Sequence, residues 1–271
     1  MRTTARSNQT QIVYFSHGGG PLPLLGDSSH QAMIDFMQNL SKEIPRPDAI
    51  LVISAHWEER VPTLLGAPNP PLYYDYYGFP QEAYDLTYPL PGNPALNRTL
   101  AKLFGEAELP YGIDPQRGFD HGVFIPLMMM YPEADIPTAQ LSLVQGLDPA
   151  LHLQLGRILQ GLDNLNLLVI GSGFSFHNLN AFFNPNGDGA DPKNEAFQDW
   201  LIDTCTADIA PSEREERLTD WEKAPYARYC HPREEHLMPL QVCAGLAGRP
   251  GELVFDHPIL NKRAVAFYWT I

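Results

Sequence analysis

The sequence has few cysteines and no long run of apolar residues. Its three cysteines, Cys205, Cys230 and Cys243, form no C-x-x-C pair, which argues against a disulfide framework and a structural zinc knuckle. No stretch approaches the roughly eighteen apolar residues that a membrane span requires, and the polar start MRTTARSNQTQ has no apolar signal core. We therefore expect a cytoplasmic protein with reduced thiols and no membrane partner.

Basic residues are also scarce. Lys and Arg number 18 against 32 Asp and Glu, which gives a formal net charge of −14. This charge repels phosphate backbones and anionic lipids, so we expect no nucleic-acid partner. A hydrophobic fraction of 44% indicates a globular core. We expect residues 1–271 to form a single domain, with residues 1–10 as a loosely attached tail, in a monomer or small homo-oligomer.

Apolar runs and helical periodicity alternate along the first two-thirds of the chain. Strands are predicted over 12–16, 48–54, 138–144 and 166–171, and the closing segments LVFDH and RAVAFYWTI predict two antiparallel neighbours. Helices are predicted over 28–43, 93–106 (capped by Asn93), near 149–161, 193–208 and 235–247. This alternation predicts an α/β fold with a central, mostly parallel mixed sheet and helices on both faces.

Four histidines lie in segments suited to aiming an imidazole: His17 in SHGGGP, His56 in VISAHWEE, His177 in GSGFSFHN and His236 in REEHLMPL. The first three follow the apolar runs IVYF, AILVIS and LNLLVIG. Side chains at strand ends converge on a cleft in open α/β folds, and imidazole is the commonest protein ligand for transition metals. The pattern predicts an enzyme with one metal ion.

Four further histidines are expected to be structural, because a lone histidine is more often a hydrogen-bonded residue than a ligand. This group contains His30, His152, His231 and His257. His231 stays an alternative ligand, since it precedes His236 by only five residues in CHPREEH. Pro232 favours a turn at that point, before the helix predicted from residue 235.

Six segments occur in an order that resembles one enzyme family. They are SHGGGPLPLLGD, ILVISAHWEE, GFPQEAYDLTYPLPG, GFDHGVFIPL, GSGFSFHNL and EHLMPL. Together they resemble the class III extradiol aromatic ring-opening dioxygenases, and within that class the single-chain DOPA 4,5-dioxygenase group. The resemblance runs from about residue 12 to the C-terminus, and it implies one catalytic domain that opens a small aromatic diol with O₂.

The resemblance also implies the roles of particular residues. His17, His56 and His236 would bind one divalent metal, Fe(II) for ring cleavage, with zinc as the other candidate. His177 would be the acid/base residue, or a fourth ligand when zinc is bound. His121 would line the pocket for oxygen and substrate.

The sequence departs from the two-histidine, one-carboxylate set of related multi-subunit enzymes. The third position matches His236, with Glu235 adjacent. On a helix from residue 235, the two side chains would point about a quarter-turn apart, so both cannot face one ion. We expect His236 to be the ligand and Glu235 to stabilise the N-terminus of that helix.

An irregular excursion over 66–92 carries six tyrosines. Long loops of this kind are usually functional, so we expect a lid in which Tyr84 and Phe79 contact the substrate. The alternative is that the loop covers a sheet edge. Asp120, beside His121, is expected either to orient that ring or to cap the following helix.

The sequence is compatible with three functions. A ring-cleaving dioxygenase needs a base to take a proton from the diol, which a neutral histidine supplies. A zinc hydrolase or lyase on the same scaffold would use three histidines equally well, because Zn²⁺ activates water. A non-enzymatic metal-dependent binding protein would have no use for the additional His177.

Overall fold

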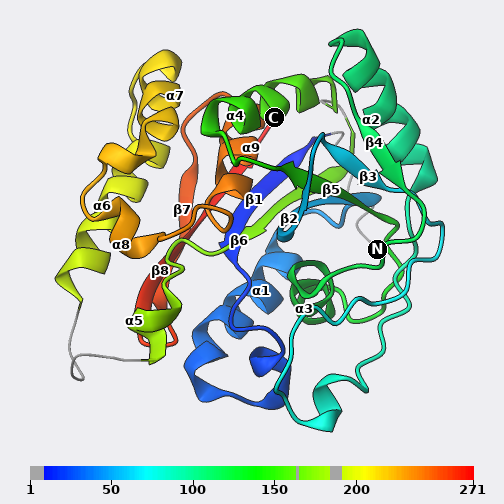
Figure 1. Ribbon diagram of the computed structural model, residues 1–271, viewed down its shortest axis with the longest axis horizontal. Helices are drawn as coiled ribbons and strands as arrows, with labels where there is room; N and C mark the ends of the chain where they lie inside the picture. The colour runs from blue at the N-terminus through cyan, green and yellow to red at the C-terminus, as the bar shows by residue number, and fades with distance from the viewer. Residues whose placement is uncertain (1–8, 163–164, 184–190) are drawn as a thin grey trace, which may run out of the picture.

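The chain is built around one eight-stranded sheet with the order β4-β3-β5-β2-β6-β1-β8-β7. The computed structural model describes residues 9–162, 165–183 and 191–271. The strands are β1 (Gln11–Ser16), β2 (Ala49–Glu59), β3 (Thr63–Leu65), β4 (Gly112–Asp114), β5 (Thr138–Val144), β6 (Leu167–Gly173), β7 (Glu252–Ile259) and β8 (Lys262–Thr270). Figure 1 shows them as a twisted central layer.

The centre of the sheet is parallel and its edges are partly antiparallel. β5, β2, β6 and β1 are parallel neighbours, whereas β8 pairs antiparallel with both β1 and β7. On the other edge, the short β3 is antiparallel to β5 and parallel to β4. The predicted mostly parallel mixed sheet and the antiparallel closing pair are therefore confirmed.

Helices cover both faces of the sheet. They are α1 (Gln31–Glu43), α2 (Pro94–Glu106), α3 (His121–Met130), α4 (Pro149–Ile158), α5 (Leu179–Phe183), α6 (Pro192–Thr206), α7 (Pro211–Thr219), α8 (Ala227–Cys230) and α9 (Met238–Ala247). One core packs α1 and α3 against the sheet, and the other packs α2, α4, α6 and α9 (Figure 1). The prediction of a single α/β domain with helices on both faces is confirmed.

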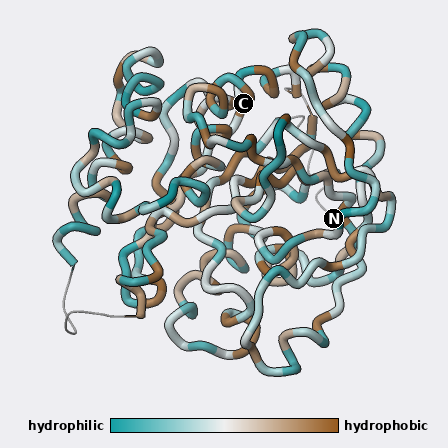
Figure 2. The backbone as a smooth tube through the Cα atoms, in the orientation of Figure 1, coloured by the Kyte–Doolittle hydropathy of each residue, from teal (hydrophilic) through white to brown (hydrophobic). Residues whose placement is uncertain are grey.

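Continuous apolar strands supply both cores at once. Along β1, Ile12 and Tyr14 point into one core, and Val13 and Phe15 point into the other. All four side chains are buried, because neighbouring residues of a strand point to opposite faces. Figure 2 shows hydrophobic residues concentrated along these central strands. Burial on both faces explains why the runs before His17, His56 and His177 are unbroken.

Most predicted elements are present with shifted ends. The helix at 28–43 begins as a 3-10 turn at Ser28–His30, and the helix near 149–161 ends as one at Leu159–Leu162. Asn93 caps α2 as expected, accepting a hydrogen bond from the backbone N–H of Leu96 at 3.0 Å. The second strand is longer than predicted and continues to Glu59, so His56 lies inside it.

The segment before β1 pairs with the last residue of the chain. Thr10 is buried and exchanges backbone hydrogen bonds with Ile271 at 3.0 and 2.9 Å. Residues 1–8 of the predicted tail lie outside the described residues. Within the described ranges, no helix is both long and apolar enough to cross a bilayer.

Candidate metal centre

Five histidines from distant parts of the chain meet at the carboxyl ends of the central strands. His17 directly follows β1, His56 lies within β2, and His177 follows β6. His121 begins α3, and His236 lies in the turn before α9. The carboxyl ends of parallel strands share one edge of a sheet, so three of these residues converge by topology alone.

A bulge in β2 helps to place His56. The pairing of β2 with β5 shifts register between Ile53 and Glu58, which brackets His56. Bulges of this kind redirect side chains and are common beside active sites. The side chain of His56 is 21% exposed, whereas that of His236 is 5% exposed.

The five imidazole rings pack against one another. Ring centroids are 4.9 Å apart for His17 and His56, 5.3 Å for His17 and His236, and 4.9 Å for His56 and His236. The ligand nitrogens of these three residues all lie within 4.8 Å of one another. His121 lies 3.9 Å from His56, and His177 stacks on His236 at 3.4 Å. The structure therefore brings together all five residues singled out by the sequence.

The outer nitrogen of His17 makes a hydrogen bond away from the cluster. Its Nδ1 lies 3.0 Å from Ser172 Oγ, and the Ser172 hydroxyl donates to the carbonyl of Gly122 at 2.5 Å. A hydroxyl has a single proton, so Ser172 must accept from His17. The ring proton of His17 is therefore on Nδ1, and Nε2 carries a lone pair.

Glu235 fixes the ring protons of two further histidines. Its Oε1 accepts from Nδ1 of His236 at 2.9 Å and from Nδ1 of His177 at 3.1 Å. An ionised carboxylate only accepts, so in the neutral form of each ring the proton lies on Nδ1 and Nε2 carries the lone pair. The expectation that Glu235 stabilises a helix N-terminus is wrong, because α9 begins only at Met238 and the carboxylate is turned toward the imidazoles.

On the other side of the histidine cluster, the carboxylate of Asp75 faces the Nδ1 atoms of two further rings. Its Oδ1 accepts from Nδ1 of His121 at 2.8 Å, and its Oδ2 faces Nδ1 of His56 at 3.4 Å. Asp75 lies in the tyrosine-rich excursion, as the only acid within YYDYY. Sequence reasoning missed it because a loop residue has no periodicity to show which way it points.

The inner nitrogens of His17 and His56 face each other. Their Nε2 atoms are 3.0 Å apart, so they share either a proton or a cation. When both ring protons are on Nδ1, the two lone pairs repel one another unless a cation lies between them. Nitrogens about 2.1 Å from a common ion lie roughly 3.0–3.4 Å apart in neighbouring coordination positions. The donor set therefore fits a divalent transition metal held by neutral imidazoles.

Burial keeps the donors unprotonated. It lowers the pKa of His17 and His56 well below the usual imidazole value, and neighbouring imidazoles add to this. Burial and the adjacent His177 likewise lower the pKa of His236 to about 3. Burial alone would raise the pKa of Glu235, but hydrogen bonds from His177 and His236 outweigh it and hold that pKa well below normal. Neutral imidazoles beside an ionised carboxylate are the state that metal binding requires.

The backbone of His236 is locked in a turn, not in the helix predicted over 235–247. Its carbonyl accepts from the N–H of Phe174 at 3.0 Å and from the hydroxyl of Tyr14 at 3.1 Å, so it is not free for a helical ladder. A Cβ on Gly173 would lie 2.1 Å from this carbonyl oxygen. Glycine at position 173 is therefore what allows the turn to approach β6.

His231 has a different environment. Its Nε2 lies 3.0 Å from the carbonyl oxygen of Ser175, and its ring lies 5.4 Å from Phe197 and 6.0 Å from Trp221. The side chain is fully buried, and burial lowers its pKa to about 3. It belongs to no cluster of ligand atoms among the described residues.

Asp120 has neither of its two expected roles. It precedes α3, but its side chain makes no capping bond, and the ring of His121 is held by Asp75 instead. The buried carboxylate of Asp120 accepts from Ser54 at 2.6 Å and from Arg117 at 3.1 Å. Arg117 also donates to the backbone carbonyl of His56 at 3.1 Å. Asp120 therefore supports the strand segment around His56.

The tyrosine-rich excursion is braced by its own hydroxyls. Tyr76 donates to the carbonyl of Ala83 at 2.6 Å, and the Tyr84 hydroxyl lies 3.5 Å from the backbone nitrogen of Phe79. Phe79 approaches the glycine turn after His17, within 3.6 Å of a Cβ built on Gly20. Tyr76 also lies 5.8 Å from His121. The excursion thus forms an aromatic wall beside the histidines.

Three histidines outside the centre predict how stability depends on pH. Burial lowers the pKa of His30, His152 and His231. In the unfolded chain each titrates near 6.5, so below about pH 6.5 unfolding takes up protons that the native state excludes. Each contributes up to about 1.4 kcal/mol per pH unit, and stability is complete above pH 6.5 and falls as the pH decreases. We expect a lower urea midpoint at pH 5.5 than at pH 7.5; an equal or higher midpoint would contradict the assignment.

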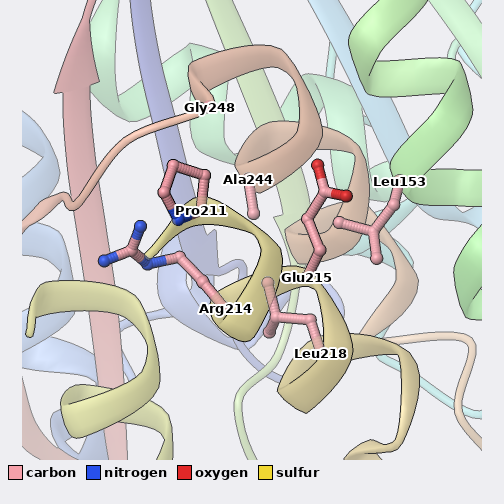
Figure 3. Close-up of a pocket in the computed structure, with 7 residues that line it drawn as sticks. All are labelled: Leu153, Pro211, Arg214, Glu215, Leu218, Ala244 and Gly248. Carbon is pink, nitrogen blue, oxygen red and sulfur yellow. The ribbon is translucent and has the colours of Figure 1, made fainter. Parts of the chain in front are cut away.

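A pocket between α4, α7 and α9 is unrelated to the histidines (Figure 3). Its volume is about 10 Å³, which is room for roughly one water molecule. It is lined by Leu153, Pro211, Arg214, Glu215, Leu218, Ala244 and Gly248. It is too small for a substrate.

Known proteins share this chain's sequence and fold. Residues 12–264 match the family described as the catalytic LigB subunit of aromatic ring-opening dioxygenase. Dioxygenase tasH from Hapsidospora irregularis is 40% identical, over 98% of this chain and 87% of the relative. The 4,5-DOPA dioxygenase extradiol of Beta vulgaris is 36% identical, over 93% and 92%.

A solved structure agrees with these matches. The crystal structure of an uncharacterized protein from Escherichia coli K12 superposes with a TM-score of 0.77 at 28% identity, covering 96% of this chain and 99% of that one. The family match over residues 12–264 includes all five clustered histidines. The chain therefore belongs to the LigB family of class III extradiol ring-opening dioxygenases.

Proposed function

We propose that the enzyme binds one divalent metal through Nε2 of His17, His56 and His236 and opens the ring of a catechol-type substrate with O₂. The observation that carries this proposal is the convergence of imidazole nitrogens, 3.0 Å apart for His17 and His56, with every outer nitrogen already hydrogen-bonded or facing a carboxylate. When the ring protons lie on those outer nitrogens, the inner lone pairs repel one another unless a cation is bound. With one, the same nitrogens form a ligand set that needs no rearrangement of ring protons.

Fe(II) is the ion we propose for ring cleavage, and zinc is the alternative occupant. When bound, a redox-active ion would bring the diol and O₂ together and relay charge between them. Three protein ligands leave coordination positions for both reactants. Imidazole is a suitable ligand for both iron and zinc, so the ligand type alone does not identify the native ion.

His177 is the residue we propose to handle the substrate proton. A catechol must lose a proton to bind through both oxygens, and Nε2 of His177 is free to accept it while Glu235 holds the other nitrogen. The side chain is 20% exposed, so a bound molecule can reach it. Its stacking on His236 at 3.4 Å also allows the alternative role of a fourth ligand.

His121 is the second residue that we propose to face the reactants. It lies 5.3 Å from His17 between ring centroids, on the Asp75 side of the cluster. With Nδ1 held by Asp75, the Nε2 of the neutral ring can accept a hydrogen bond from substrate or from an oxygen-derived group that carries a proton. With His177 on the Glu235 side, the reactants would lie between two acceptors.

The proposed substrate is a small aromatic diol, with Phe79 and Tyr84 on its wall. The aromatic wall beside His121 suits stacking on a flat ring. The names of the relatives place DOPA among the diols to be tried. All three cysteines are free and buried, which supports a reducing, cytoplasmic location for a monomer or small oligomer.

Oxygen uptake tests the proposal. We would strip the protein of metal, load it anaerobically with Fe(II), add a panel of catechols including DOPA, and then admit air. We expect uptake of one O₂ per ring opened and a yellow semialdehyde product with at least one diol, and none with metal-free protein. No uptake across the panel, together with zinc-dependent hydrolysis of esters or amides, would overturn the proposal in favour of a hydrolase.

A further inference from the structure

Asp75 reaches the metal centre from a loop that is pinned against the start of α3. The backbone N–H of Tyr73 donates to the carbonyl of Phe119 at 2.7 Å, next to a bridge between Leu72 and Phe119. A Cβ on Gly118 would lie 2.4 Å from the carbonyl oxygen of Pro71, so glycine permits this close approach. The side chain of Asp75 is only 11% exposed. The loop therefore delivers one carboxylate to a fixed place.

The two oxygens of Asp75 have different partners. Oδ1 accepts from both the backbone N–H of His121 at 2.9 Å and its Nδ1 at 2.8 Å. Oδ2 faces Nδ1 of His56 at 3.4 Å. Both oxygens must therefore be acceptors for His56 and His121 to keep their protons on Nδ1.

Glu235 is connected in another way. A single oxygen, Oε1, serves both His177 and His236. Its other oxygen, Oε2, lies 3.3 Å from Nη1 of Arg233, whose side chain is 57% exposed. Only one oxygen of Glu235 is therefore needed to orient imidazoles, and the second points toward a solvated guanidinium.

We infer that Asp75 is a positioning residue that sets the tautomer of a metal ligand, His56, and of His121 at the same time. This inference rests on the metal centre proposed above. Asp75 holds the ring proton of His56 on the outer nitrogen, so that Nε2 can bind a metal, and holds His121 as an acceptor toward the reactants. No other carboxylate among the described residues contacts either ring.

The connectivity predicts an unusual order of mutational effects. In Asp75→Asn, the amide oxygen must stay with the two donors of His121, which turns the NH₂ toward Nδ1 of His56. A donor there forces the proton of His56 onto Nε2, where it blocks metal binding. Asp75→Ala leaves Nδ1 of His56 to water and imposes no tautomer. The isosteric change should therefore be worse than the truncation.

The affinity of the metal-stripped variants for Zn²⁺ tests this order of mutational effects. We expect Asp75→Asn to weaken Zn²⁺ binding about 10–100-fold, as for other residues that orient metal-bound histidines. Asp75→Ala should lose less Zn²⁺ affinity than Asp75→Asn. The matched Glu235→Gln should also lose less, because its amide oxygen can still accept from both imidazoles. Urea unfolding of the metal-free variants shows whether each is folded. A purely structural role would make Asp75→Ala the more damaged variant, which would overturn the inference.

Imidazole ¹⁵N chemical shifts give a readout that does not depend on activity. In metal-free Asp75→Asn, His56 should move to the tautomer protonated on Nε2, while wild type and Glu235→Gln keep it protonated on Nδ1. An unchanged tautomer with unchanged Zn²⁺ affinity would overturn the inference. If His56→Ala also bound Zn²⁺ like wild type, the proposed centre itself would be wrong, which is a separate outcome.

Discussion

Alanine in place of His17, His56 or His236 should each weaken metal binding by more than about 100-fold, because a lost ligand costs more than a lost supporting residue. Ring-opening activity should fall with the metal content. All three nitrogens lie within 4.8 Å of one another, so removing any one leaves two donors and one coordination position without a protein ligand. Metal analysis of the purified variants, and chelator competition with Zn²⁺, measure the loss directly.

His231→Ala is the matched control for these variants. His231 is as buried as His17 and His236 and lies five residues from His236, but its Nε2 is engaged with the carbonyl of Ser175. The variant should keep its metal and lose only stability, through the cavity between Phe197 and Trp221. Loss of metal in His231→Ala, with retention in His236→Ala, would contradict the proposed ligand set.

The sequence predicted the fold because the strands carry their own signal. Unbroken apolar runs mark strands buried on both faces, and such strands are typical of a parallel sheet with helices on each side. The same argument placed His17 and His177 at strand ends, since an apolar run ends where a polar residue and a turn begin. Topology then brings strand ends together without any further information.

The hydrogen bonds that orient the rings could not be predicted in this way. Glu235 was expected at a helix N-terminus because its segment is apolar and periodic, but the backbone turns at His236 to meet Phe174 and Tyr14. That turn depends on Gly173, which lies 63 residues earlier, since 236 − 173 = 63. Local periodicity contains no trace of such a contact.

Asp75 shows the same limit more sharply. Its role depends on a loop without regular structure that lies against the start of α3, and on two histidines at positions 56 and 121. A single acid among tyrosines carries no spacing that distinguishes it from a solvated loop residue. Asp120, next to His121 in sequence, was the more obvious candidate, yet it faces Ser54 and Arg117. Proximity in sequence is therefore a poor guide to which carboxylate orients a ring.

The two carboxylates divide the centre into two halves with the same plan. Glu235 joins the proposed ligand His236 to His177, and Asp75 joins the proposed ligand His56 to His121. Each half thus couples a residue proposed to hold the metal with one proposed to act on the reactants. In the proposed centre, this arrangement would orient the rings before any ligand binds, and such preorganisation favours catalysis.

Removing His177 should separate catalysis from metal binding. In His177→Ala, Glu235 still accepts from His236, so the ligand keeps its tautomer and the metal should stay. The substrate proton loses its acceptor, and kcat should fall about 10²–10⁴-fold, the usual contribution of general acid–base catalysis. His177→Phe preserves the ring stacked on His236 at 3.4 Å but has no nitrogen, so it should be equally slow if proton transfer is what is lost.

Steady-state oxygen uptake, with the metal content of each variant measured alongside, distinguishes the roles of His177. Slow turnover with full metal in both variants supports an acid/base residue. A fall in bound zinc in both variants would instead identify His177 as a fourth ligand. Full activity in His177→Ala would contradict both roles, because the Nε2 of His177 would then have no part in a reaction that begins with loss of a proton from the diol.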